Sequence, residues 1–306
     1  MSKKEVAEFE EYENLKNSKF KQQKLPGWRP VPSMARTVTI FITLGIVFAA
    51  LGVLILLFTN KVVEFIQEYD DNCNHIEYKI NNTMENNIFI YYRIDGFYQN
   101  HRRYIKSKSE SQLNGTDISL KDMIKSKDCD PIVTNSDMGV NISIDGSNLS
   151  LSDVAIPCGL MAKNYFNDKF TNWKINNINI TINDTNIARK SDRKNYKNID
   201  KSKQWQDMED EHFLVWMRPS PFPNFEKLWG RIPCNLKIGD ILSVDIENNY
   251  NVSKFGGKKY LIIRTINNFG GKNIVLAIGY IVFGGISLIL GIIFFISFKA
   301  KEKKEK

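Results

Sequence analysis

Two long stretches of the chain carry no charged residue: residues 38–59 and residues 274–298. At a rise of about 1.5 Å per residue, a helix of either length crosses a hydrocarbon core of about 30 Å. Buried helices of soluble proteins are usually shorter and amphipathic, whereas charged clusters flank these two stretches. The pattern predicts two transmembrane helices.

Short runs rich in β-branched and aromatic residues lie between the two spans, at 88–94, 175–182, 241–246 and 260–266. Strict alternation from Ile178 to Ile182 predicts a half-buried strand. Asn and Gly residues after position 248 indicate a turn, so we expect the last two runs to form a hairpin. The predicted fold class is a membrane protein whose two helices flank a mainly antiparallel β domain with long irregular insertions.

Basic residues gather at the tail side of both spans. Residues 1–37 hold eight Lys and Arg against five Glu, and residues 299–306 hold five Lys against two Glu. The positive-inside rule therefore places both tails in the cytosol and residues 60–273 in an exoplasmic domain. That central part is almost balanced, with 29 basic and 27 acidic residues, which excludes the charge pattern of a nucleic-acid-binding protein.

Glycosylation sequons and cysteines favour the same orientation. N-glycosylation occurs on the lumenal side, and all seven sequons lie between the spans: Asn81, Asn114, Asn141, Asn148, Asn179, Asn183 and Asn251. The four cysteines, Cys73, Cys129, Cys158 and Cys234, lie there too. In an oxidising lumen they predict two disulfides with three alternative connectivities. Their spacing is not that of a zinc site, so we expect no metal.

The cytosolic segment 20–32, FKQQKLPGWRPVP, places Phe20, Leu25 and Trp28 among cations. Such a segment suits the headgroup region of a membrane, but a disordered linker that merely supplies positive charge has the same composition. Residues 189–212 leave a similar choice open, because their charges suit either a partner-binding patch or a solvated insertion.

The spans themselves contain small residues and no ionisable ones. Gly45 and Ala49, and likewise Ser287 and Gly291, are spaced for close helix packing, within the chain or against another membrane protein. Without an ionisable residue, neither span offers a site for an ion or proton at the membrane midplane. We therefore do not expect this chain to transport by itself.

No pattern of catalytic residues emerges. FGGK occurs at 255–258 and 269–272 without the GKS or GKT ending of a phosphate loop, which favours turn glycines. The three histidines are far apart, and acidic pairs such as Asp70 and Asp71 are typical of a solvated surface. The sequence predicts no catalytic, cofactor-binding or metal-binding residue.

Six separate segments carry a family resemblance. In order they are FKQQKLPGW (20–28), FYQNHRRYIKS with SQLNG (97–107, 111–115), IPCGL with FND (156–160, 166–168), EHFLVWMRPSPFPNFEKLWGRI (211–232), NNYNVSKFGGKKYL (248–261) and GGKNIVLAIGYIVFGG (270–285). In this order and topology the chain resembles the cell division control protein 50 family, the accessory β-subunits of type-four P-type ATPases that flip phospholipids.

The resemblance implies a non-catalytic subunit that forms a heterodimer with a ten-span flippase, helps it leave the endoplasmic reticulum and stabilises it during transport. The catalytic residues would belong to the partner chain. The implied compartments are the endoplasmic reticulum, Golgi, endosomes or plasma membrane. Residues expected to contact the partner are Phe20, Leu25, Trp28, Arg102, Arg103, Trp216 and Arg218.

The resemblance also bears on the cysteines and glycans. Cys129 and Cys158 match a disulfide pair of the family, and Asn81 matches a family sequon. Cys73 and Cys234 depart from the family pattern, and we expect them to bridge distant parts of the domain. The sequence Asn167-Asp168-Lys169 lacks a sequon that the family often carries.

Two other classes of protein share parts of this pattern. A two-span ligand-gated channel subunit also has cytosolic tails and a bridged ectodomain, but it usually carries more cysteines and polar residues along its pore. A lumenal ectoenzyme would need a catalytic constellation that the sequence does not supply.

Overall fold

The computed structural model of the chain describes residues 12–13, 16–23, 33–70, 72–85, 88–267 and 270–304. It divides into two compact units. One contains most of the two long helices, and the other is Ile55–Ile274. We call this second unit the ectodomain because it holds the chain between the two apolar helices, without regard to the side of the membrane.

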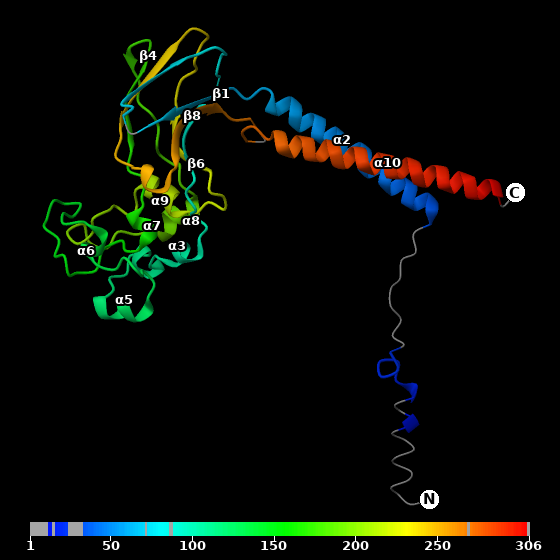
Figure 1. Ribbon diagram of the computed structural model, residues 1–306, viewed down its shortest axis with the longest axis horizontal. Helices are drawn as coiled ribbons and strands as arrows, with labels where there is room; N and C mark the ends of the chain where they lie inside the picture. Colours follow the sequence, from blue (N-terminus) through cyan, green and yellow to red (C-terminus); the bar gives the residue numbers. More distant parts are fainter. Residues whose placement is uncertain are drawn as a thin grey trace, which may run out of the picture. The chain divides into compact units, whose positions relative to one another are not determined.

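The helical unit is built from α2 (Met34–Thr59) and α10 (Ile274–Lys304), which run side by side in Figure 1. Both helices are long and apolar enough to cross a membrane, with mean hydropathy of 3.0 and 2.6. Only 17% and 11% of their most apolar windows are buried within the chain. The remaining apolar surface therefore suits contact with lipid or with other membrane helices.

Glycines bring the two helices into close contact. A Cβ atom added to Gly45 would lie 2.6 Å from Cγ of Leu288, and one added to Gly52 would lie 2.9 Å from the carbonyl oxygen of Ala277. From the other helix, a Cβ on Gly284 would lie 2.7 Å from the backbone nitrogen of Ala49. These three glycines thus serve packing within this chain.

Replacing Gly52 with Leu is expected to force α2 and α10 apart, because a larger side chain meets the backbone of the other helix. Overpacking of this kind costs about 1–3 kcal/mol. The melting temperature of the purified protein in detergent measures the loss. Gly279→Leu is the matched control, since a Cβ there meets nothing within 4 Å; equal melting temperatures for the two variants would contradict the close packing.

The ectodomain contains two four-stranded antiparallel sheets. The first has the order β1-β8-β3-β6 and the second β2-β7-β4-β5. Their bounds are β1 (Glu64–Tyr69), β8 (Lys258–Thr265), β3 (Ile88–Asp95) and β6 (Phe225–Ile232), then β2 (His75–Lys79), β7 (Ile241–Glu247), β4 (Lys169–Ile175) and β5 (Ile178–Asn179). The predicted antiparallel β domain is confirmed.

The two sheets pack face to face as a sandwich. Strand β3 alternates strictly between buried and half-buried residues, because every second side chain points into the core. Rings from opposite sheets meet there: the centroids of Phe65 and Tyr78 are 6.3 Å apart, and those of Tyr69 and Phe170 are 6.0 Å apart. One contiguous hydrophobic core therefore serves both sheets.

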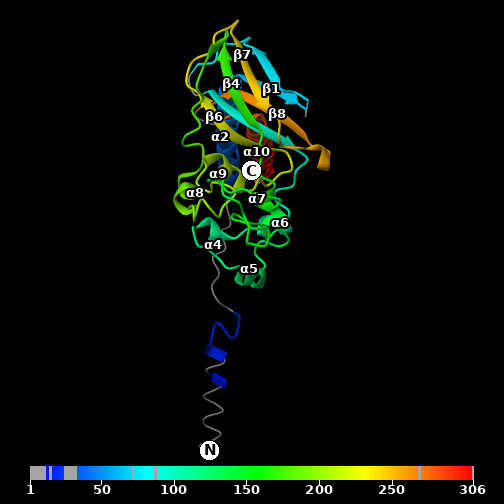
Figure 2. The same ribbon diagram turned by 90° about the vertical axis from the view of Figure 1, so that its left-hand side faces the viewer.

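Short helices gather at one end of the ectodomain and the strands at the other (Figures 1 and 2). The helical elements are α3 (Arg102–Lys106), α4 (Glu110–Leu113), α5 (Leu120–Ser126), α6 (Asn135–Met138), α7 (Leu160–Lys163), α8 (Lys190–Asn195), α9 (Glu211–Met217) and the 3₁₀ turn η1 (Ser253–Phe255). A disulfide joins Cys129 to Cys158 within this end, as the family resemblance implied. Both cysteines are buried, and the bridge joins the chain just after α5 to the chain just before α7.

The predicted hairpin of residues 241–246 and 260–266 is wrong. Both runs are strands, but β7 belongs to one sheet and β8 to the other. The chain between them crosses from sheet to sheet, and the buried Asp168 side chain accepts hydrogen bonds from the backbone nitrogens of Asn249 and Tyr250 in that crossing. Turn residues indicate where the chain bends, but they do not determine which strand the following strand pairs with.

The half-buried strand predicted at 178–182 is only partly present, because β5 covers Ile178–Asn179 alone and both residues are exposed. Asn176 and Asn177 adopt the left-handed conformation, with φ of 49° and 67°, and form a turn between β4 and β5. Strand β5 is only two residues long and Ile178 is 70% exposed. The alternation therefore reflects a short edge strand followed by an extended connection.

The expected bridge between Cys73 and Cys234 is absent, and both are free thiols in the part of the chain that the structure describes. Cys73 precedes β2, whose residues pair with β7 from His75 to Lys79. The same antiparallel pairing continues to Met84 and Leu236, next to Cys234. The two cysteines thus lie at opposite ends of this ladder, and β2 alone is about 13 Å long. Their Cα atoms are therefore farther apart than the roughly 7 Å that a disulfide can span.

Candidate functional site

Two loops that are far apart in the sequence are fastened together beside the short helices. The side-chain amide of Asn100 donates to the carbonyl oxygen of Pro221 over 2.7 Å, although the residues are 121 positions apart. The backbone nitrogen of Phe97 donates to Pro223, and that of Ser220 donates to the buried side chain of Gln99. Residues 96–100 and 220–224 therefore form one rigid unit.

Phe97 anchors this unit in the core. Its ring lies 5.4 Å from Tyr104, 5.9 Å from Trp216, 6.5 Å from Phe225 and 5.2 Å from Phe255, measured between centroids. These contacts come from α3, α9, β6 and η1. Three of the six segments that carry the family resemblance thus meet around the ring of Phe97.

In and beside these two loops, side chains of two kinds are exposed to solvent. Tyr98 is 63% exposed and Phe222 is 68% exposed. Arg102 and Arg103 on α3 are exposed, and Arg218 follows α9 with half of its side chain in solvent, 3.5 Å from Asp192. We call these five residues the Tyr98–Phe222 surface. Exposed aromatic and arginine side chains are the residue types that dominate binding energy at protein interfaces.

A buried lysine holds the backbone under this surface. The amine of Lys227 donates to the carbonyl oxygens of Val215 and Arg218, at the end of α9, where helix carbonyls lack helical partners. Burial, and then the charge of Arg218, lower the pKa of Lys227 to about 7. The position of Arg218 therefore depends on a side chain that the sequence analysis did not single out.

The expected contact residues divide into three groups. Arg102, Arg103 and Arg218 reach the surface, and Phe20 is 75% exposed. Leu25 and Trp28 lie outside the described residues. Trp216 corrects the expectation, because its side chain is completely buried and donates to the carbonyl oxygen of Met161 over 2.8 Å. It supports the surface from within the core.

A second cluster, the Asp168–Lys259 cluster, joins the two sheets. Oδ2 of Asp168 lies 2.8 Å from Nζ of Lys259 and accepts from the hydroxyl of Tyr69 over 3.0 Å, while both charged side chains are fully buried. Lys259 also donates to the carbonyl oxygen of Tyr250 and to the side chain of Asn248. Burial, followed by the Asp168 charge, raises the pKa of Tyr69 well above its ordinary value.

The Asp168–Lys259 cluster was not predicted from the sequence, although both residues lie in segments that carry the family resemblance. Asp168 ends the string FND and Lys259 lies in the string that ends at Leu261. A buried charge is stable only with a partner, and the sequence did not show that these two residues meet. Tyr98 and Phe222 also lie within segments that carry the family resemblance. Their exposure depends on the folded chain and could not be predicted from those segments.

Two further observations concern the predicted glycosylation sequons and the expectation that no metal is bound. All seven sequon asparagines have exposed side chains, which an attached glycan requires. Among the residues that the structure describes, no group of three or more His, Cys, Asp or Glu side chains is arranged to hold a metal ion.

Two apolar helices and a disulfide-bridged β-sandwich ectodomain define the class: an integral membrane protein with a large domain outside the membrane. Residues 4–304 match the LEM3 (ligand-effect modulator 3) family / CDC50 family. The chain therefore belongs to this family, as the six segments indicated.

Curated relatives support the assignment. The chain is 33% identical over 286 residues to ALA-interacting subunit 3 of Arabidopsis thaliana, covering 82% of this chain and 76% of the relative. It is 30% identical over 306 residues to cell cycle control protein 50A of Mus musculus, covering 82% and 79%. Cell cycle control protein 50C of Bos taurus is 28% identical over 307 residues, covering 82% and 83%.

Proposed function

We propose that this chain is the non-catalytic accessory subunit of a type-four P-type ATPase that flips phospholipids. Membership of the family carries the proposal, and relatives in Arabidopsis thaliana are named as subunits that interact with another protein. ATP hydrolysis and the lipid path belong to the partner. Spans without ionisable residues suit a chain that supports transport and does not conduct it.

The proposed topology has both tails in the cytosol and the ectodomain on the exoplasmic side. The basic tails support this orientation, and the disulfide suits an oxidising compartment. The chain forms a heterodimer with the ATPase, is needed for its folding and its export from the endoplasmic reticulum, and accompanies it to the Golgi, endosomes or plasma membrane. Its apolar helices contact membrane lipid.

The Tyr98–Phe222 surface is the proposed docking site for exoplasmic loops of the ATPase. It is rigid because two loops are hydrogen-bonded to each other and anchored by Phe97. A preformed surface loses little conformational entropy on binding, and exposed aromatic rings beside arginines are effective anchors. The cytosolic segment 20–32, with Phe20, Leu25 and Trp28, is proposed as a second contact.

Removing this surface is expected to weaken the complex without unfolding the ectodomain. The variant Phe222→Ala combined with Arg102→Ala and Arg103→Ala should lower recovery of the ATPase with the tagged chain at least about tenfold, which is about 1.4 kcal/mol. The measurement is the ratio of the two subunits after affinity purification. The melting temperature should stay near that of the unchanged protein, because these side chains lie in solvent.

A control with equally exposed side chains uses one apolar residue and two cations elsewhere on the ectodomain. Ile238 is also 68% exposed, and Lys121 and Lys125 are exposed on α5. Replacing these three with Ala should leave recovery of the ATPase unchanged. If both triple variants recovered it equally well, the Tyr98–Phe222 surface would not be the docking site.

A further inference from the structure

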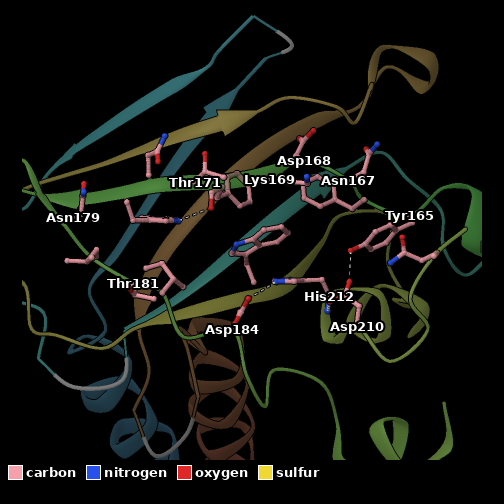
Figure 3. A pocket seen from close by; sticks show the side chains of 18 of the residues that line it. Tyr165, Asn167, Asp168, Lys169, Thr171, Asn179, Thr181, Asp184, Asp210 and His212 are labelled. Carbon is pink, nitrogen blue, oxygen red and sulfur yellow. Dashed lines mark hydrogen bonds and ion pairs between the residues drawn. The ribbon is translucent and has the colours of Figure 1, made fainter. Parts of the chain in front are cut away.

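A groove of about 920 Å³ lies between the two sheets of the ectodomain (Figure 3). Strand β4 lines it, together with Trp229 of β6 and side chains from residues 205–212. The connection after β5 also lines it and is held on both sides, because the backbone nitrogen of Ile180 donates to the carbonyl oxygen of Trp173 and Asn183 pairs with Arg231 of β6. We call it the β4–β6 groove. Its size lies within the range of sites that hold small ligands.

Both walls of the groove depart from regular strand geometry. In β6, Trp229 is an extra residue between Leu228 and Gly230, which pair with consecutive residues of β3. In β4, the register shifts between Thr171 and Lys174, and Asn172 there has a positive φ of 51°. Bulges redirect side chains, and here both bulges contribute lining residues to the same groove.

The lining contains aromatic rings and uncharged polar groups beside its charged side chains. Trp205 and Trp229 are half-buried in the wall, with the ring of His212 packed on Trp229 at 4.0 Å between centroids. Amide or hydroxyl groups come from Asn167, Thr171 and Thr181. A sugar ring has apolar C–H faces and a rim of hydroxyl groups, so aromatic rings beside amides and hydroxyls match its chemistry.

Other ligand classes fit the groove less well. The lysines that line it lie beside protein oxygen atoms: Lys163 donates to the carbonyl oxygen of Asp137, and Lys169 is 3.7 Å from Glu247. A phosphate-bearing ligand would also meet the carboxylate of Asp184, which lies 3.6 Å from His212. A dashed line joins the two side chains in Figure 3. A lipid chain would leave the polar lining groups without water or hydrogen bonds.

A sequon lies on the wall itself. Asn179, in the sequon Asn179-Ile180-Thr181, lines the groove with an exposed side chain, and Figure 3 shows it beside Thr181 on one wall. A glycan attached at its side-chain nitrogen therefore begins at the groove. Asn183, in the next sequon, is not among the described residues that line the groove. Its side-chain oxygen accepts a hydrogen bond from the hydroxyl of Thr185.

We propose that an N-glycan on Asn179 occupies the β4–β6 groove, with its first sugar rings against the aromatic side chains of the wall. This inference rests on the proposed exoplasmic placement of the ectodomain. Attachment forms a bond between the Asn179 side-chain nitrogen and C1 of the sugar. The bond from C1 to the diphosphate of a lipid-linked oligosaccharide donor breaks, and the amide loses one proton. The glycan then covers the edge between the sheets.

Native deglycosylation tests the proposal on the unchanged protein. The full-length chain, purified with its companion, is treated with a peptide N-glycosidase without denaturant, and release at each sequon is followed by mass spectrometry. Release at Asn179 should be about tenfold slower than at Asn183, because a seated glycan must leave the groove before cleavage. Equal rates at the two sites would overturn the proposal, and so would an unmodified Asn179 in a chain glycosylated elsewhere.

Two variants identify the groove as the cause of protection. Thr171→Tyr fills the groove and should raise the release rate at Asn179 to that at Asn183. Lys125→Tyr on α5, at an exposed residue outside the described groove lining, is the control and should preserve the protection. Protection that persists in Thr171→Tyr would contradict seating in the groove. A chain without glycan at any of the seven sequons would contradict the exoplasmic placement itself.

Discussion

Replacing Asp168 with Ala is expected to cost about 3–5 kcal/mol of folding stability, because it leaves the buried Lys259 amine without its carboxylate. It also leaves the hydroxyl of Tyr69 and the backbone nitrogens of Asn249 and Tyr250 without their acceptor. Domains are commonly stable by only about 5–15 kcal/mol, so much of the protein should fail to fold. Yield and melting temperature of the purified chain measure the loss.

Lys169→Ala is the neighbouring control. Its side chain is 66% exposed and faces Glu247 at 3.7 Å, a type of surface ion pair that contributes little. The double variant Asp168→Asn with Lys259→Met should recover part of the loss, since neither charge is then left unpaired in the core. If Asp168→Ala melted at the temperature of Lys169→Ala, the cluster would not join the sheets as described.

Removing the disulfide should have the second largest effect. The variant Cys129→Ala with Cys158→Ala is expected to lose about 2–5 kcal/mol, because the bridge constrains the unfolded chain and lies in the core. The two cysteines are 29 positions apart and are 0% and 1% exposed. Melting curves with and without reductant measure the effect, and the variant should no longer respond to reductant.

The other two cysteines provide the control. Cys73 and Cys234 are free, so Cys73→Ala with Cys234→Ala should keep most of the stability and the full response to reductant. A loss as large as that of the bridged pair would show that these two cysteines are joined in the protein and would contradict the separation along the β2–β7 ladder.

Local sequence patterns predicted the features that depend on local physics. Uncharged stretches of 22 and 25 residues were sufficient for the two apolar helices, and the run at 88–94 corresponds to β3. Pairing between strands depends on distant contacts. The hairpin prediction failed because Asp168, eighty positions before the crossing, holds the backbone of Asn249 and Tyr250.

Exposure was equally hard to derive from the sequence. Trp216 and Phe222 are both large aromatic residues in one string, yet the first is completely buried and the second is 68% exposed. Trp216 follows the period of α9 into the core, whereas Phe222 lies in a proline-rich loop fastened to residues 96–100. The β4–β6 groove depends on two register shifts that no local pattern announces.

Purification of the tagged full-length chain from its own membranes shows whether it is a subunit of a P-type ATPase. We expect one stoichiometric companion of about a hundred kilodaltons or more, identified by mass spectrometry as a P-type ATPase, in a complex with one copy of each chain. A homotrimer of this chain, or a chain recovered without any ATPase, would overturn the proposed function.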